Sequence, residues 1–250
     1  MFPASAEGRC LAGLVRREGP PRAVRVAVRS PQEGREISLR WFGHSFFRLI
    51  SPGGARILTD PFGPEMGLPI PRTRPHAITV SREHSHHNSV EVADGKPLII
   101  RGLKDGGLEW TKVRETVRDV LVYNVPITQR TYEWNTKGAA FVFEMGGLCV
   151  AHLGDLAEAL NPSQLRRLGK IHLAMVPIGG AFTMGPEEAR AQVLALRPNI
   201  AIPMHYWDDE DRLARFLRGA SRIRRIGRAA LRLSRRTLPP PTLFVVMEHG

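Results

Sequence analysis

The sequence predicts an α+β fold in which two packed β-sheets carry helices on their outer faces. Short apolar runs separated by turn residues fill the first half of the chain, and similar runs alternate with helical segments in the second half. The 250 residues suffice for one large domain or two small ones, and 42% hydrophobic with 24% charged residues is ordinary for a globular protein. This composition excludes a disordered or fibrous chain.

The strands begin as an antiparallel meander. Runs at 37–42 and 46–50 flank the segment Gly43-His44-Ser45, and a Pro-Gly-Gly turn leads into a third run at 56–59. Further strands are predicted at 77–80, 97–101, 113–117, 120–125, 139–144, 148–152, 171–176, 200–204, 231–234 and 243–247.

Three helices have recognisable start and stop residues. The first begins after the cap Asn161 with Pro162 at its first position, and it ends at Gly169. The second begins at Gly185 with acids in its first turn and stops before Pro198. The third begins within the acidic run 208–211 and ends near residue 219.

The formal net charge of +12 is concentrated at the two ends of the chain. Residues 1–36 carry +3 and residues 212–250 carry +9, so the middle is neutral. We interpret these ends as solvated basic surface. Nucleic-acid binding through the arginine-rich segment 212–236 is a weaker alternative, because no base-reading motif accompanies it. No apolar run approaches the roughly 18 residues that span a bilayer, so we expect no membrane insertion.

The first 35 residues have few apolar repeats and several prolines. We expect a poorly ordered basic extension over 1–35, dispensable for stability, and one domain over 36–250. No secretory signal is recognisable, and only Cys10 and Cys149 occur. We therefore expect no disulfide and a cytoplasmic location.

The densest polar cluster is the loop 81–88, which follows the apolar run 77–80 and contains His84, His86 and His87. Imidazoles on a strand end can converge on one metal ion, although a solvated loop is equally consistent with this segment alone. Two later strands end in Asp155 and His205. A carboxylate and an imidazole from separate strand ends complete a plausible metal site.

Six segments in order carry a resemblance to a known family: WFGHSFF (41–47), TDPF (59–62), the histidine loop, HLGD (152–155), VPIGG (176–180) and PMHY (203–206). Together they resemble the metallo-β-lactamase fold superfamily, in its bacterial branch of metal-dependent hydrolases. The resemblance implies a four-layer αββα sandwich of two mixed sheets. It also implies one or two metal ions at the sheet edge, where a metal-bound hydroxide attacks an ester, lactone, amide or phosphodiester.

The departures from the family's H-x-H-x-D-H loop are informative. Arg82 stands at its first histidine, His84 at its second, His86 at its aspartate and His87 at its last histidine. By register, Gln129 stands where the family supplies a further histidine. The bridging carboxylate, Asp155, and the final histidine, His205, are retained.

The resemblance therefore implies a metal-dependent hydrolase with an altered site that binds at most one divalent ion. Zinc is the first choice, with iron or manganese as alternatives. The ligand candidates are His84, His86, His87, Asp155 and His205, with Asp155 and His86 in catalytic roles and a small molecule as substrate. A homo-oligomer is possible. The alternative interpretation is a metal-free scaffold that serves as a binding or structural module.

Other conspicuous residues receive a structural interpretation. We expect His44 to make a structural hydrogen bond rather than reach the rim of the site, and His152 to be buried and hydrogen-bonded. We expect Trp110, Trp134 and Trp207 to pack in the core rather than line a substrate mouth.

Overall fold

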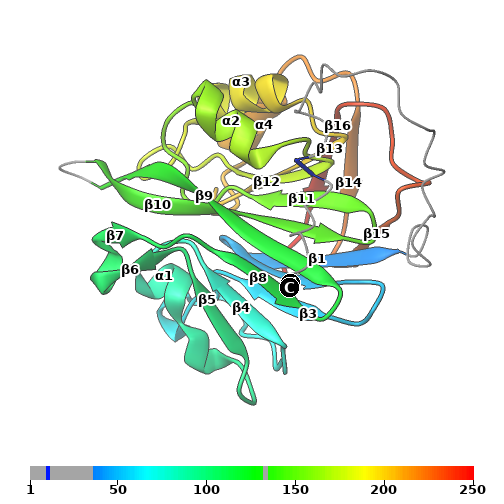
Figure 1. Cartoon of the computed structure of the whole chain (residues 1–250). Helices are drawn as coiled ribbons and strands as arrows, with labels where there is room; N and C mark the ends of the chain where they lie inside the picture. The colour runs from blue at the N-terminus through cyan, green and yellow to red at the C-terminus, as the bar shows by residue number, and fades with distance from the viewer. Residues whose placement is uncertain (1–9, 12–35, 132–134) are drawn as a thin grey trace, which may run out of the picture.

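The computed structural model describes residues 10–11, 36–131 and 135–250, and these form two stacked β-sheets (Figure 1). The six-stranded sheet has the order β15-β1-β2-β3-β4-β5. Its strands are β1 (Ile37–Gly43), β2 (Phe46–Ile50), β3 (Arg56–Thr59), β4 (Ala77–Val80), β5 (Leu98–Arg101) and β15 (Leu231–Leu233). A two-stranded ribbon, β6 (Leu103–Lys104) with β7 (Glu109–Trp110), lies next in the chain.

The eight-stranded sheet has the order β14-β16-β13-β12-β11-β10-β9-β8. Its strands are β8 (Arg114–Val117), β9 (Val120–Arg130), β10 (Asn135–Met145), β11 (Leu148–His152), β12 (Leu173–Pro177), β13 (Ile200–Met204), β14 (Ile223–Ile226) and β16 (Leu243–Met247). Strands β8 to β11 pair antiparallel, whereas β11, β12, β13, β16 and β14 pair parallel.

Helices α2 (Pro162–Leu168), α3 (Pro186–Leu196) and α4 (Glu210–Leu217) cover the outer face of the eight-stranded sheet (Figure 1). The other outer layer is thin: it consists of α1 (Ser85–Asn88) and the 3₁₀ turns η1 (Pro64–Met66), η2 (Val90–Val92) and η3 (Asp105–Gly107). The predicted αββα sandwich of two mixed sheets is confirmed, with one helical layer much smaller than the other.

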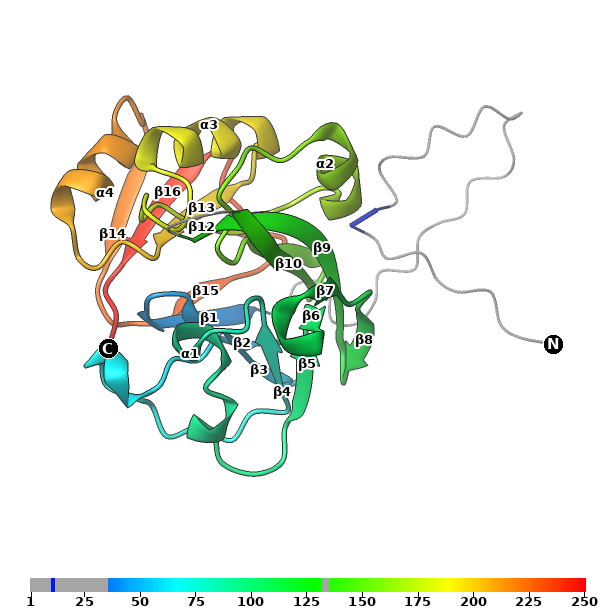
Figure 2. The same cartoon turned by 90° about the vertical axis from the view of Figure 1, so that its left-hand side faces the viewer.

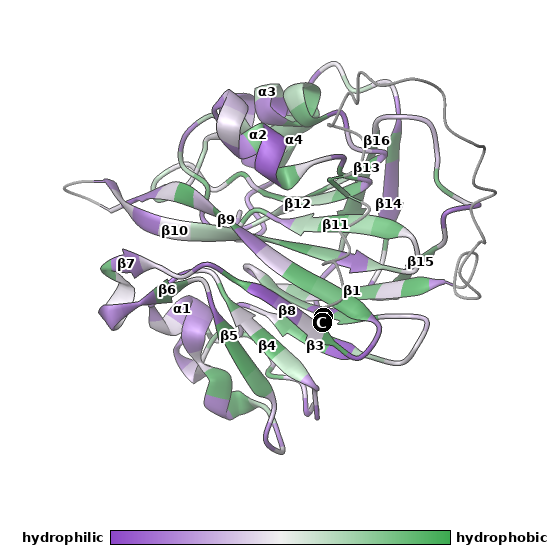
Figure 3. Cartoon of the chain, in the orientation of Figure 1, coloured by the Kyte–Doolittle hydropathy of each residue, from purple (hydrophilic) through white to green (hydrophobic). Residues whose placement is uncertain are grey.

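The hydrophobic core lies between the sheets and beneath the three long helices. Its largest cluster joins strands of both sheets and includes Trp41, Phe47, Phe141 and Phe143, all buried. Figure 3 shows the corresponding pattern, with hydrophobic stretches along the strands and hydrophilic residues on α2. Burial of these aromatic and branched side chains is the main force that holds the two sheets together.

The helix boundaries follow the capping residues that the sequence contains. Asn161 accepts hydrogen bonds from the backbone of Ser163 and Gln164, and the Gln164 side chain accepts from the backbone N–H of Asn161, which completes a capping box. Gly169 ends this helix with φ of 73°, a value that favours glycine.

The expectation that the chain has no disulfide is wrong. Cys10 and Cys149 are bonded across 139 residues of sequence, and Cys10 is only 1% exposed. Lys170, just after α2, donates its backbone N–H to the Cys10 carbonyl at 3.0 Å, and Figure 2 shows this short piece beside α2. The sequence around Cys10 has little apolar periodicity, and it does not indicate which distant residue Cys10 meets. The remainder of the predicted 1–35 extension lies outside the described residues.

This bond also removes one of the two observations on which a cytoplasmic location was predicted, because stable disulfides are typical of oxidising compartments. Among the residues described, no helix has the length and apolar character needed to cross a bilayer.

Candidate metal centre

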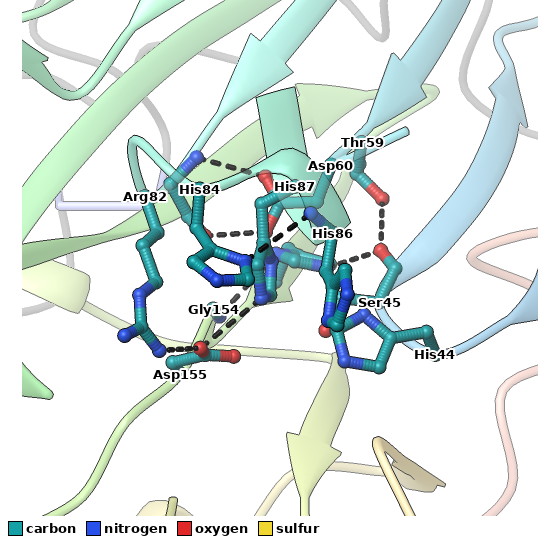
Figure 4. A network of polar contacts seen from close by, with 12 residues as sticks. His44, Ser45, Thr59, Asp60, Arg82, His84, His86, His87, Gly154 and Asp155 are labelled. Atoms are coloured by element: carbon teal, nitrogen blue, oxygen red, sulfur yellow. Dashed lines mark hydrogen bonds and ion pairs between the residues drawn. The ribbon is translucent and has the colours of Figure 1, made fainter. Parts of the chain in front are cut away.

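The six-stranded sheet contributes most of the basic side chains of the site, which Figure 4 shows at close range. His44 lies in the tight turn between β1 and β2 and has a left-handed φ of 49°. Arg82 follows β4, and the chain then turns through α1, which carries His86 and His87. The predicted histidine loop is thus partly a single helical turn, capped by the side chain of His84.

The eight-stranded sheet contributes two side chains, each from the carboxyl end of a parallel strand. Asp155 follows β11, and His205 directly follows β13 with φ of 61°. Gly179, beside them, has no room for a side chain, because a Cβ there would lie 2.3 Å from the His205 carbonyl oxygen. The carboxyl ends of parallel strands lie at one sheet edge, where ligand sites commonly form.

Asp155 is the centre of the polar network. Its Oδ2 accepts a hydrogen bond from Arg82 Nη1 at 2.8 Å and lies 3.1 Å from His87 Nε2, while Oδ1 lies 3.4 Å from His205 Nε2. Burial alone would raise the pKa of Asp155, but the positive charges of His87, His205 and Arg82 hold it well below its usual range. Asp155 is therefore a carboxylate throughout the neutral pH range.

His87 lies between two carboxylates. Its Nδ1 is 3.0 Å from Asp60 Oδ2, and its Nε2 faces Asp155. Burial lowers the pKa of His87, yet Asp155 and Asp60 together raise it to about 9. Asp60 is itself held by Ser81, whose backbone N–H donates to Oδ1 at 2.8 Å and whose hydroxyl donates to Oδ2. A carboxylate behind an imidazole fixes the orientation of a metal-binding histidine.

Asp60 is a residue of the site that was not predicted from the sequence. It belongs to the TDPF segment directly after β3. A carboxylate at the end of a strand is the sequence signal that could have identified it.

His44 occupies a different position from the one expected. Its backbone carbonyl does make structural bonds, accepting from Trp41 Nε1 at 3.0 Å and from the His205 N–H at 3.2 Å. Its ring, however, is buried against the cluster, with its centroid 4.0 Å from that of His205 and 4.7 Å from that of His87. Burial, followed by the neighbouring charges of His205 and His87, lowers the pKa of His44 well below its usual value.

One ligand atom from each of His44, His87 and His205 lies within 4.8 Å of the other two. The structure thus brings together three of the five predicted ligands with one new histidine: His87, Asp155 and His205 join His44. His84 and His86 lie further out. His84 is exposed and its Nδ1 accepts the backbone N–H of His86 at 3.3 Å, while His86 is half-buried with its ring 5.8 Å from that of His44.

These residues line a cavity of about 280 Å³, together with Phe182 and Trp207. Trp207 is 55% exposed, so the expectation that it packs in the core is wrong. Trp110 is also exposed, at 41%, and Trp134 lies outside the described residues. Gln129 is buried, donates from Nε2 to the Lys137 carbonyl at 2.5 Å, and is not among the residues that line this cavity.

The donor set fits a divalent cation. Within this cluster, His44 Nδ1 and Asp155 Oδ1 are two of the ten buried side-chain polar atoms of the described residues that have no hydrogen-bond partner, as ligand atoms for an ion would be. Imidazole nitrogens with one carboxylate oxygen suit zinc, iron or manganese.

A family model described as the β-lactamase superfamily domain matches residues 38–205. The chain belongs to this superfamily. The metallo-β-lactamase resemblance is thereby confirmed, and the members similar to this chain include proteins named as metal-dependent hydrolases. One, from Methanoculleus marisnigri, is 30% identical over 186 residues, which cover 68% of this chain and 81% of that protein.

Solved structures agree. A protein from Thermotoga maritima, described as a Zn-dependent hydrolase of the metallo-β-lactamase superfamily, is 30% identical with a TM-score of 0.68, and the match covers 86% of this chain and all of the other. A Parabacteroides distasonis protein described as a metal-dependent hydrolase shares the fold, with 19% identity, a TM-score of 0.61, and coverage of 75% of this chain and 90% of the other.

Proposed function

We propose that this protein is a hydrolase that uses one divalent metal ion, zinc before iron or manganese, bound by His44, His87, His205 and Asp155. The observation that carries this proposal is the convergence of three buried imidazoles on one buried carboxylate in a cavity. The similarity to proteins named as metal-dependent hydrolases supports it.

Arg82 limits the site to a single ion. Its guanidinium carries a permanent positive charge and has no lone pair to offer a metal. Arg82 Nη1 donates to Asp155 Oδ2 at 2.8 Å. The guanidinium therefore occupies the side of the carboxylate on which a second ion would have to bind. A second metal ion at that face would meet both a fixed like charge and a shortage of ligands.

When bound, such an ion supplies a hydroxide near neutral pH by lowering the pKa of its water, and it polarises the bond to be cleaved. Asp155 stays ionised and orients the imidazoles around it. His86 lines the cavity, and burial followed by the charge of His87 lowers its pKa, so its neutral ring is available to take up a proton and to deliver that proton in a later step.

The cavity favours a substrate with a negative charge near the bond that breaks. Arg82 and the histidines face one carboxylate, and Phe182 and Trp207 add aromatic surface for an apolar portion. Esters, lactones, amides and phosphodiesters that carry or develop a negative charge fit this lining. We place the protein among small-molecule hydrolases on that basis.

The matched variants His44→Ala and His84→Ala test the ligand set. The apo-protein is titrated with zinc, and bound equivalents are counted after desalting. We expect one equivalent in the parent protein, a loss of affinity of about tenfold or more in His44→Ala, and little change in His84→Ala. Two tightly held ions, or equal losses in the two variants, would contradict the proposal.

One observation favours a metal-free binding module as the second candidate. Asp155 already has cationic partners in Arg82 and His87, so the carboxylate is compensated without an ion. If no zinc is retained by any form and a panel of ester, lactone and phosphodiester substrates is left intact, this candidate replaces the first.

A further inference from the structure

A second cavity, of about 470 Å³, lies between α2, the strands β8 and β9, and the tethered residue Leu11. It shares no lining residue with the histidine cavity, and it is the larger of the two. Its volume falls within the range of about 300–1,000 Å³ that is typical of small-molecule sites. We refer to it as the basic cavity.

The walls of the basic cavity are held in place by hydrogen bonds. Tyr123 donates its hydroxyl to the Leu168 carbonyl at 2.9 Å, which fastens the end of α2 to β9. The Asn124 side chain accepts the Val113 N–H at 2.9 Å and donates to the Thr111 carbonyl at 2.8 Å. The cavity is therefore preformed, which reduces the entropy lost when a ligand binds.

The lining combines apolar surface with positive charge. Leu11, Val113 and Pro126 supply aliphatic surface, and Lys112, Arg166 and Arg167 are exposed cations of the lining. No aspartate or glutamate is among the described residues that line it. The nearby Glu144 instead faces the disulfide-bonded residue Cys10, whose N–H it accepts at 3.5 Å.

The disulfide supplies one wall. Cys10 is bonded to Cys149, and its neighbour Leu11 is thereby placed against the cavity. The residues on both sides of Cys10 and Leu11 lie outside the described part of the chain. The described attachments of this wall are the disulfide and the two backbone hydrogen bonds of Cys10, to Glu144 and from Lys170.

We propose that the basic cavity binds a small amphiphilic anion, a carboxylate that carries an aliphatic chain. The chain packs against Leu11, Val113 and Pro126, and the carboxylate pairs with Lys112, Arg166 and Arg167. Charge-assisted hydrogen bonds from guanidinium groups recognise the head group, and burial of methylene groups supplies affinity. This site is independent of the metal centre and of the reaction proposed there.

The proposal is tested by calorimetric titration of the full-length oxidised protein with decanoate, decan-1-ol and decyltrimethylammonium. We expect decanoate to bind about tenfold or more tightly than the neutral alcohol, and the cation to bind more weakly still. Reduction of the disulfide should weaken decanoate binding severalfold, because Leu11 is then no longer held in the wall.

Variants locate the probe. Arg166→Gln with Arg167→Gln should weaken decanoate binding about tenfold, whereas the charge-matched pair Arg224→Gln with Arg225→Gln, on the exposed strand β14, should not. Ser163→Trp, which fills the cavity from α2, should abolish binding, and Arg82→Gln should leave it unchanged. Thermal unfolding verifies that each variant is folded.

Several results would overturn the proposal: no binding of decanoate, equal binding of decanol, or parent-like binding by the Arg166/Arg167 or Ser163 variants. Loss of binding in Arg82→Gln would place the probe in the histidine cavity and would also overturn it.

Discussion

The two sheets make unequal contributions to the metal centre. The loops of the six-stranded sheet supply a ring of basic side chains, namely His44, Arg82, His84, His86 and His87. The eight-stranded sheet supplies Asp155 and His205, each placed at the end of a buried parallel strand. One side is rich in basic groups on turns and on the single turn of α1, and the other carries the single anionic ligand on a rigid support.

The departures from the family's motif that the sequence resemblance implies would follow this division, with Gln129 on β9 as the exception. Arg82 and His86 both lie in the segment after β4, whereas the strand ends retain the carboxylate and the final histidine. A short loop with a one-turn helix can change side chains without disturbing strand pairing. A strand end such as Asp155 is constrained by the core beneath it.

Asp155→Asn has the largest expected effect, because it removes the one carboxylate that the eight-stranded sheet contributes to the ligand set. Arg82 and His87 would face a neutral amide in a buried site, so we expect a loss of about 3–5 kcal/mol in the free energy of unfolding and no retained zinc. Urea unfolding and metal counting measure the two effects.

Asp208→Asn is the matched control, because this carboxylate is 66% exposed and pairs with His249 at 2.8 Å. We expect a change of at most about 1 kcal/mol there. Stoichiometric zinc in Asp155→Asn would show that the three histidines alone are sufficient.

The disulfide attaches residue 10 to the eight-stranded sheet, because Cys149 belongs to β11, the strand that leads to Asp155. Cys10→Ala should lower the free energy of unfolding by about 2–4 kcal/mol, because the bond restricts the unfolded chain. Thermal unfolding with and without reductant measures this. The parent protein should lose stability on reduction and the variant should not. If reduction changes the stability of neither protein, the prediction that residues 1–35 are dispensable still stands.

His172 gives the eight-stranded sheet a sensitivity to acid. Burial, followed by the charge of Arg235, lowers the pKa of His172 from 6.5 to about 4. Its Nδ1 accepts the Cys149 N–H at 2.9 Å, and Arg235 Nη1 contacts its Nε2. Between these two pKa values the unfolded chain binds a proton that the folded protein does not, so stability falls as pH falls from about 6.5 to about 4.

His172→Asn keeps an acceptor for the Cys149 N–H and removes the titration. Between pH 7.5 and pH 4.5 we expect the parent protein to lose about 2 kcal/mol more than the variant, allowing for partial screening by solvent. Urea unfolding at both pH values measures the difference. Parallel losses in the two proteins would assign the acid sensitivity to other groups.

Much of the fold was predictable from local pattern, since the bounds of β2, β3, β4, β11 and β13 coincide with the apolar runs in the sequence. The strand β14 was missed because it is an edge strand whose sequence, IRRI, is mostly exposed, so it shows no buried alternation. Strands β9 and β10 extend beyond their apolar runs because they pair with each other over almost their full length.

Site residues that follow a strand directly were predictable from the sequence. Residues that reach the site only because two distant turns pack together were less so. Asp155 and His205 end obvious strands, whereas the position of His44 depends on a turn that meets His205 through a backbone hydrogen bond across 161 positions of sequence. The bond between Cys10 and Cys149 is of the same kind. Periodicity reports which face of an element is buried, and it carries no information about which distant turns meet.

Arg82→Gln has the smallest expected effect, and it tests the contribution of the six-stranded sheet's permanent positive charge most directly. The Arg82 guanidinium competes with a metal ion for Asp155, to which it is 2.8 Å away, and its side chain is only 14% exposed. Removing its charge should raise zinc affinity about tenfold, equivalent to about 1.4 kcal/mol.

Arg101→Gln is the control, because Arg101 pairs with Glu83 in the same region and does not contact Asp155. Zinc titration of the three proteins at one ionic strength measures the effect. Weaker zinc binding in Arg82→Gln would mean that the guanidinium supports the ligand set, and Arg82 would then be a positioning residue for Asp155 instead of a competitor.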